Sequence, residues 1–142
     1  MQLAYNNRGI TYSMQGKYNQ AIRAFGRAIE IRPKYTDAYC SRGFAYNGLG
    51  NYNQAIEIRP QYSEAYYNRG IAYNSLGNYD KAIESFDRAI EINPGYAEAY
   101  NNRARAYWNL GDRNNAIRDL KIAAKLGNKA SQESLRRQRI AW

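Results

Sequence analysis

The sequence repeats itself at an interval of 34 residues, and this period constrains the fold more than any other feature. Small residues, tyrosines, alanines and prolines return at the same place in successive copies. The aligned positions are Gly9, Gly43, Gly70 and Ala104; Tyr12, Tyr46, Tyr73 and Tyr107; Ala21, Ala55, Ala82 and Ala116; and Pro33, Pro60 and Pro94. A fixed period of this length predicts a solenoid, in which each unit buries its apolar face against its neighbours. Solenoids offer extended surfaces, so the period favours a binding protein.

Each repeat is expected to form two antiparallel helices. In the third repeat, Tyr66, Gly70 and Tyr73 follow one another at helical spacing, which predicts a first helix over residues 63–76. Gly77 suits the left-handed end of that helix, because glycine has no Cβ to clash there. A second helix follows and stops before Pro94. Its apolar face comprises Ala82, Ile83, Phe86, Ala89 and Ile90.

The spacing of these residues resembles the tetratricopeptide repeat. That family has a large residue at repeat position 4, a small one at 8, Tyr at 11, Ala at 20, an aromatic at 24, Ala at 27 and Pro at 32. The first repeat supplies Tyr5, Gly9, Tyr12, Ala21, Phe25, Ala28 and Pro33. The resemblance implies an all-α fold, a right-handed α-α superhelix of antiparallel helix pairs with a C-terminal capping helix.

The resemblance also sets the expected boundaries. We expect a single domain over residues 1–142, with repeats at about 2–35, 36–62, 63–96 and 97–130. A capping helix is expected at about 129–141, with Asn128 able to cap its start. Terminal segments of a solenoid need a polar outer face, which Arg136, Arg137 and Arg139 would provide.

The second repeat is seven residues shorter than the others. Its second helix lacks the segment equivalent to Ser85–Glu91, and Pro60 disfavours a continuous run into the next helix. The deletion removes the aromatic at position 24, which predicts a hole or a kink in the stack. Two outcomes are open: the array closes up with a local change of path, or apolar surface stays exposed and invites another chain.

An arginine occupies position 7 of every repeat, where the family usually has an apolar residue. These residues are Arg8, Arg42, Arg69 and Arg103. The favoured interpretation is structural: each alkyl stem lies along a neighbouring helix and each head reaches water or a carboxylate. The alternative is a row of cations that contacts a ligand.

In the family, the first helices of successive repeats line a concave groove that binds peptides. The residues expected there are Asn6, Asn7, Ile10, Phe44, Asn47, Tyr67, Asn68, Ile71, Asn74, Asn101, Asn102, Arg105 and Trp108. A carboxamide both donates and accepts, so the asparagines could pair with a peptide backbone. Phe44, Ile71 and Trp108 would supply apolar pockets, and Arg105 could bind a carboxylate. A solvated surface explains the asparagines equally well.

Several classes of site are not expected. Histidine is absent and Cys40 is the one cysteine, so we expect no catalytic centre, no metal site and no cofactor. The start of the chain lacks the features of a signal peptide, and no apolar run is long enough to span a membrane. Together with the lone cysteine, this predicts a cytoplasmic protein. The net charge of +9 is concentrated towards both ends of the chain and would attract acidic peptides. No recognised nucleic-acid-binding module is present, so we expect no specific nucleic-acid binding.

These features predict a protein–protein interaction module, a scaffold or adaptor that is not an enzyme and binds a protein or peptide segment in the groove. The alternative is self-association into a domain-swapped or end-to-end oligomer. That oligomer would form through the truncated second repeat or the open N-terminal face.

Overall fold

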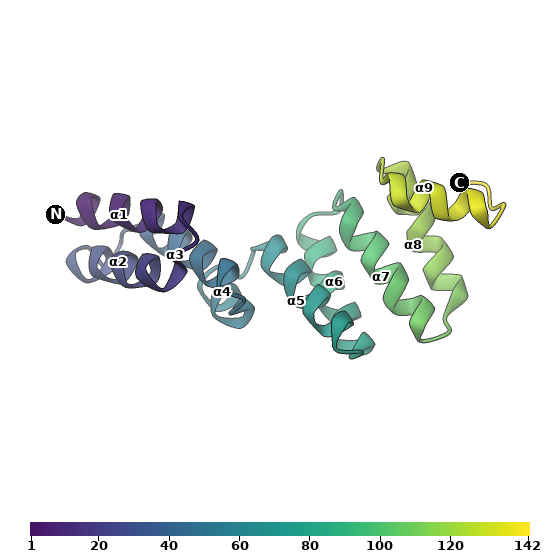
Figure 1. Ribbon diagram of the computed structural model, residues 1–142, viewed down its shortest axis with the longest axis horizontal. Coiled ribbons are helices and arrows are strands. Elements are labelled where there is room, and N and C mark those ends of the chain that lie inside the picture. The colour runs from purple at the N-terminus through teal and green to yellow at the C-terminus, as the bar shows by residue number, and fades with distance from the viewer. The chain divides into compact units, whose positions relative to one another are not determined.

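The computed structural model describes residues 1–142 and consists of nine helices without strands (Figure 1). In chain order they are α1 (Gln2–Met14), α2 (Tyr18–Ile31), α3 (Thr36–Gly48), α4 (Tyr52–Ile58), α5 (Ser63–Ser75), α6 (Tyr79–Ile92), α7 (Ala97–Asn109), α8 (Arg113–Lys125) and α9 (Lys129–Arg137). The chain divides into two compact units, called here the N-terminal unit (Met1–Ala65) and the C-terminal unit (Tyr66–Trp142). The single domain expected over residues 1–142 stays a prediction.

Consecutive helices pack against one another within each unit. In the N-terminal unit α1 packs on α2, α2 on α3, and α3 on α4. In the C-terminal unit α6 packs on α7, α7 on α8, and α8 on α9. The predicted antiparallel helix pairs are therefore present. In addition, α3 and α7, the first helices of repeats two and four, contact α2 and α6, the second helices of the repeats before them.

The recurring small residue at position 8 is explained by the ring at position 24. Phe25 and Phe86 are completely buried. A Cβ added to Gly9 would lie 2.5 Å from Cε1 of Phe25, and one added to Gly70 would lie 2.6 Å from Cε1 of Phe86. The two helices of a repeat approach this closely because position 8 has no side chain, and the ring fills the space between them.

The missing phenylalanine of the second repeat is replaced by side chains from the end of α4. This helix is seven residues long. A Cβ added to Gly43 would lie 3.0 Å from Cδ of Arg59 and 3.5 Å from Cγ2 of Ile58. The Arg59 guanidinium lies over the Tyr62 ring, 4.4 Å from its centroid. The stem of Arg59 and the Ile58 side chain thus occupy the place where we expected a hole.

The capping helix ends at Arg137, four residues earlier than expected. Its start is as predicted, because the Asn128 side chain accepts a hydrogen bond from the Ser131 amide at 2.9 Å. Arg139 then adopts a left-handed φ of 56°, and the Ile140 amide donates to the Leu135 carbonyl at 2.9 Å. Ile140 packs on the buried cluster of Ala104, Leu120, Ala124 and Leu135. The chain turns back to bury Ile140, which offsets the cost of a non-glycine residue in this conformation.

Candidate functional site

The expected binding residues lie mainly on the same face of each first helix, at repeat positions 5, 9 and 12. These equivalent helix faces, taken separately in each unit, are called here the first-helix stripe. Its members are Asn6, Ile10 and Ser13 on α1; Cys40, Phe44 and Asn47 on α3; Tyr67, Ile71 and Asn74 on α5; and Asn101, Arg105 and Trp108 on α7. The spacing of four and then three residues places each trio on one helix face.

Three members of the stripe carry a buried polar atom without a hydrogen-bond partner. They are Asn6 Oδ1 and Ser13 Oγ in the N-terminal unit and Asn74 Oδ1 in the C-terminal unit. Leaving such an atom unsatisfied costs about 1–3 kcal/mol. An unmatched acceptor at this position therefore favours a ligand that brings its own donor.

A pocket of about 310 Å³ opens beside the α1 part of the stripe. It is lined by Ile10, Ser13, Met14, Tyr18, Phe25, Ser41 and Phe44. Ile10 and Phe44 remain 40% and 47% exposed although both are strongly apolar. The structure therefore brings two expected binding residues, Ile10 and Phe44, to one apolar pocket. Met14 was missed, although it lies four residues after Ile10 and continues the same helical face.

The remaining two site residues of the N-terminal unit are positioned differently. Asn7 is exposed at repeat position 6, beside the stripe, and its carbonyl oxygen accepts a hydrogen bond from the Thr11 hydroxyl at 3.0 Å. Asn47 is buried and hydrogen-bonds the Tyr62 hydroxyl. Burial is the main reason that the pKa of Tyr62 rises to about 12. Asn47 thus uses its amide inside the protein.

In the C-terminal unit, a second pocket of about 500 Å³ lies between α7 and α9. It is lined by Asn101, Ala104, Arg105, Trp108, Leu120, Ala130, Ser134 and Gln138. Asn101 Oδ1 accepts a hydrogen bond from the Ser131 hydroxyl at 2.7 Å, and Arg105 is exposed. Trp108 also borders a larger hollow, where Arg113 stacks on its ring at 5.0 Å. Arg113 was not predicted; it stands at the repeat position that carries Tyr18, Tyr52 and Tyr79 in the other three repeats.

Tyr67 and Asn102 form an internal link between α5 and α7. The Asn102 Nδ2 group donates to the Tyr67 hydroxyl at 3.1 Å and to the Glu98 carbonyl at 2.9 Å. The Tyr67 ring lies 4.8 Å from that of Tyr96, and burial raises the pKa of its hydroxyl. Because both amide protons of Asn102 have acceptors, only its carbonyl oxygen is left to meet a peptide. Asn68 and Ile71 are half-buried.

The position-7 arginines share one contact, a stack on the tyrosine three residues earlier. The distances from guanidinium carbon to ring centroid are 5.0 Å for Arg8–Tyr5, 5.3 Å for Arg42–Tyr39, 5.2 Å for Arg69–Tyr66 and 5.4 Å for Arg103–Tyr100. Such stacks stabilise a fold by about 0.5–2 kcal/mol each.

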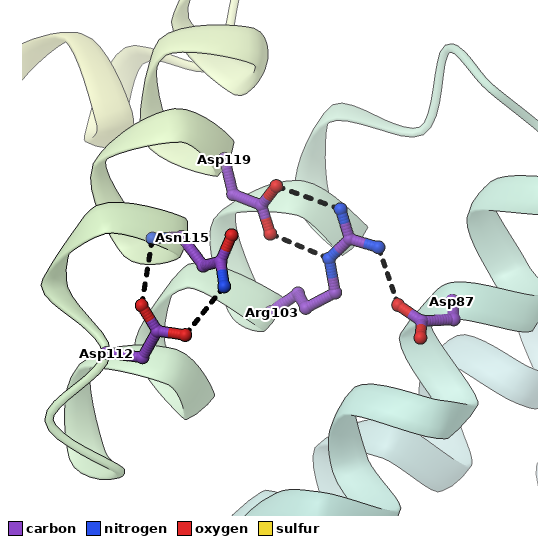
Figure 2. A network of polar contacts seen from close by, with 5 residues as sticks. All are labelled: Asp87, Arg103, Asp112, Asn115 and Asp119. Carbon is purple, nitrogen blue, oxygen red and sulfur yellow. Dashed lines mark hydrogen bonds and ion pairs between the residues drawn. The ribbon is translucent and has the colours of Figure 1, made fainter.

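The polar ends of these arginines differ from repeat to repeat. Arg103 donates to both oxygens of Asp119 on α8 and to Asp87 on α6 (Figure 2). Burial alone would lower the pKa of Arg103, but the hydrogen bonds and charges of Asp119 and Asp87 raise it overall. Arg69 Nε donates to the Ser85 hydroxyl at 3.1 Å. The Nε of Arg42 is buried without a partner. Arg103 reaches carboxylates, as the favoured structural interpretation expects, whereas Arg69 reaches a serine hydroxyl.

Neither a metal-binding cluster nor a membrane-spanning helix is found. No group of three histidine, cysteine, aspartate or glutamate side chains comes together in a way that could hold a metal ion. None of the helices combines the length and the apolar character that crossing a membrane requires.

Comparison with solved structures identifies similar folds. A crystal structure of MamA is 29% identical to this chain, with a TM-score of 0.67 over 92% of this chain and 81% of that one. A thermophilic tetratricopeptide protein of Thermus thermophilus is 25% identical, with a TM-score of 0.53 over 90% and 75% of the two chains. MamA from Desulfovibrio magneticus is 20% identical, with a TM-score of 0.65 over 89% and 75%, and shows likeness of fold alone. No curated protein is a significant match to the sequence.

Sequence profiles give the family. One tetratricopeptide repeat profile matches residues 3–35 and 63–96, and a second matches residues 24–57 and 85–118. The predicted all-α tetratricopeptide fold is confirmed by these profiles and by the similar structures. Members of the family are generally protein-interaction modules rather than enzymes, which supports a scaffold with protein partners. Because the profiles cover well over half of the residues, the chain belongs to the tetratricopeptide repeat family.

Proposed function

We propose that the chain is a scaffold that binds an extended segment of a partner protein along the part of the first-helix stripe on α1 and α3. The observation that carries this proposal is the α1 trio: Ile10 is exposed between Asn6 and Ser13, whose buried oxygens have no partner. A peptide backbone presents an N–H donor at every residue except proline. A segment lying over Ile10 would cover the apolar side chain, and its N–H groups would satisfy both oxygens once the Asn6 and Ser13 side chains turn towards it.

An apolar side chain of the partner fits the pocket between Ile10 and Phe44. The buried Phe25 ring contributes to the wall of that pocket, and Met14 borders it. Burying one such side chain contributes about 1.5–3 kcal/mol. Because Met14 has a flexible, polarisable side chain, this pocket suits apolar residues of several shapes.

The C-terminal unit offers a different chemistry. Trp108 is surrounded by Arg105, Arg113 and Arg137, and of these Arg137 is paired with Glu133 at 3.1 Å. An aromatic or acidic side chain suits this pocket, because arginine binds carboxylates and stacks on rings. We propose that it recognises an acidic segment of a partner.

The expected asparagines differ in whether their side chains are available to a ligand. Asn6 and Asn74 have unmatched oxygens, which supports contact with a ligand. Asn47, Asn101 and Asn102 make internal hydrogen bonds. Asn7 is an exposed polar residue beside the stripe. We therefore propose Asn6 and Asn74 as the carboxamides that bind peptide backbone.

The self-association alternative has less support at the second repeat. Arg59 and Ile58 fill the place of the deleted phenylalanine, so the apolar hole that a second copy would cover is occupied.

A display selection with random peptides tests the proposed function. Peptides enriched on the wild-type chain are measured by fluorescence anisotropy against Phe44→Asp and Leu49→Asp. Phe44 and Leu49 are both large apolar side chains with similar exposed fractions, 47% and 43%, but only Phe44 lines the pocket. We expect Phe44→Asp to weaken binding by about tenfold or more, because it puts a charge in an apolar pocket. Leu49→Asp should bind as the wild type does; equal loss in both variants would contradict the proposal.

A further inference from the structure

The pocket of about 310 Å³ between α1, α2 and α3, called here the α1 pocket, has an uncharged wall rich in aromatic rings. Phe25 is completely buried, and its ring lies 2.5 Å from a Cβ added to Gly9. The Tyr18 ring is held in the same way, 2.5 Å from a Cβ added to Gly48. Phe44 completes the aromatic part of the wall. Fixed rings of this kind suit an aromatic occupant, because aromatic pairs gain more than the area they bury.

Ser13 brings to the α1 pocket a hydroxyl group that the fold leaves unused. Its Oγ is buried and has no hydrogen-bond partner. Other hydroxyls of first helices donate to the carbonyl four residues earlier, as Thr11 does at 3.0 Å and Ser75 at 2.9 Å. A serine hydroxyl accepts and donates at once. Ser13 can therefore accept from a peptide N–H and also donate to a polar side chain of the same peptide.

The C-terminal unit contains a tyrosine in an equivalent setting. The Tyr67 ring lies 5.9 Å from the Phe86 ring, measured between centroids. Its hydroxyl accepts a hydrogen bond from Asn102 Nδ2 at 3.1 Å. A tyrosine thus packs on the phenylalanine at position 24 and bonds through its hydroxyl to the next first helix.

The N-terminal unit has the surroundings of this tyrosine without the tyrosine itself. Phe25 has the repeat position of Phe86, and Ser41 has that of Asn102; both line the α1 pocket. The residue of α1 at the position of Tyr67 is Asn6, which has no ring. The α1 pocket therefore lies where a tyrosine ring has a precedent in the same chain.

Other side chains match fewer features of the α1 pocket. A charged side chain would lose its hydration against a wall that carries no charge. An aliphatic side chain lacks the ring contacts with Phe25 and Tyr18. Phenylalanine makes those contacts but offers no oxygen to the hydroxyls of Ser13 and Ser41.

We infer that the α1 pocket binds a tyrosine side chain of the partner segment. The tyrosine ring lies on Phe25, and its hydroxyl bonds to the hydroxyls of Ser13 and Ser41. The inference rests on the proposed function and names which of the side chains that fit the pocket is preferred.

A host peptide with one variable residue tests this preference. The peptide acetyl-Gly-Ser-Gly-X-Gly-Ser-Gly-amide, with tyrosine, phenylalanine or leucine at X, is titrated into the isotope-labelled full chain and followed by NMR. We expect the tyrosine peptide to bind most tightly and to shift the signals of Met14 and Phe44. The phenylalanine peptide should bind about fivefold more weakly, because it lacks one hydrogen bond. The leucine peptide should be weaker again, because the ring contacts are lost.

Three variants separate the hydrogen bond from the shape of the pocket. Ser13→Ala/Ser41→Ala removes both hydroxyls and should make the tyrosine and phenylalanine peptides bind equally. Ser75→Ala removes a hydroxyl outside the α1 pocket and should keep the fivefold preference. Asn6→Tyr gives α1 the residue of α5 and should weaken the tyrosine peptide by about tenfold, because a ring of the chain itself then takes the place. Circular dichroism checks that each variant keeps its helices.

Several results would overturn the inference. They are no binding of the tyrosine peptide, equal binding of all three peptides, a tyrosine preference that persists without both hydroxyls, and unchanged binding by Asn6→Tyr. The proposed function fails on a different result, namely display-selected peptides that are weakened equally by Phe44→Asp and Leu49→Asp. Selected peptides that depend on Phe44 but place leucine or phenylalanine in the pocket would leave the proposed function standing and overturn the tyrosine preference alone.

Discussion

Arg103 on α7 donates two parallel hydrogen bonds to Asp119 on α8, from Nε at 2.7 Å and from Nη2 at 2.8 Å (Figure 2). The Asp119 side chain is completely buried and that of Arg103 is 13% exposed. This bidentate pair is largely shielded from water, unlike the surface ion pairs of the same chain. Removing either partner would therefore leave the other charge poorly hydrated.

Replacing Asp119 should therefore be costly. We expect Asp119→Asn to lower the free energy of unfolding by about 3 kcal/mol, because it leaves the largely buried guanidinium with only the more exposed Asp87 as its counter-charge. Glu30→Gln is the matched control, since the Arg27–Glu30 side chains are 66% and 64% exposed. It should change stability by less than about 1 kcal/mol. Urea unfolding of both variants measures the difference; similar small values would show that the buried pair contributes little.

Adding one methyl group to different glycines should have effects of opposite sign. Gly70→Ala places a Cβ 2.6 Å from the Phe86 ring and should destabilise by about 1–3 kcal/mol. At Gly43 the nearest atom, 3.0 Å away, belongs to the flexible Arg59 side chain, so Gly43→Ala should cost less. Nothing lies within 4 Å of a Cβ at Gly26, inside α2, and Gly26→Ala should stabilise by about 0.5–1 kcal/mol. Thermal unfolding gives this order, and a destabilising Gly26→Ala would contradict it.

Much of the fold could be predicted because the repeat encodes its own packing. Glycine at position 8 and phenylalanine at position 24 predict a close helix pair wherever both are present. The repacking of the second repeat could not be predicted in the same way. Arg59 stands 16 residues after Gly43, as Phe25 stands after Gly9 and Phe86 after Gly70, so counting gives its place. What residue type does not predict is that the stem of an arginine fills the space of a phenylalanine ring. The early end of α9 likewise depends on the burial of Ile140 against Leu120 and Leu135, contacts that are absent from a local helical pattern.

The unmatched Arg42 suggests a stabilising substitution. Gly26 of α2 occupies the repeat position of Asp87, and α2 packs on α3, which carries Arg42. Gly26→Asp should stabilise by about 1 kcal/mol more than Gly26→Asn, because it places a carboxylate where Asp87 stands relative to Arg103. In an Arg42→Gln background this advantage should disappear. Urea unfolding of Gly26→Asp and Gly26→Asn, each with Arg42 and with Arg42→Gln, completes this double-mutant cycle. If the advantage of aspartate persists without Arg42, the stabilisation does not come from a contact with Arg42.

Alkaline pH should weaken the protein through Tyr62. Burial raises the pKa of its hydroxyl from the ordinary 10.0 to about 12 in the folded state. Below pH 10 the hydroxyl is protonated in both states, and its contribution to stability is complete. Between pH 10 and 12 the unfolded chain ionises first, so the free energy of unfolding falls as pH rises.

Comparison with Tyr62→Phe isolates this effect from the other tyrosines. The wild type should lose about 1 kcal/mol relative to the variant between roughly pH 9.5 and 11, measured by urea unfolding at each pH. Parallel pH profiles for the two proteins would contradict the predicted role of Tyr62.

The candidate site was harder to predict than the fold. Residue type indicates that an asparagine can bind a peptide, but it does not say where the carboxamide points. Asn6 and Asn101 occupy the same repeat position, yet Asn101 accepts a hydrogen bond from Ser131 and Asn6 has an unmatched oxygen. The difference arises because Ser131 lies on α9, and this contact between helices is set by the packed structure. Exposed apolar residues such as Ile10 and Phe44 could be placed from helical spacing alone.

NMR mapping of a display-selected peptide tests most directly whether ligands bind on the first-helix stripe. Isotope-labelled chain is titrated with the unlabelled peptide, and the shifts of backbone and side-chain signals are followed. We expect the largest changes at the Asn6 carboxamide, at Ile10, at Ser13 and at the Phe44 ring, with little change at Lys81 and Glu84 on the exposed part of α6. Changes concentrated on α6, with the Asn6 and Ile10 signals unmoved, would contradict it.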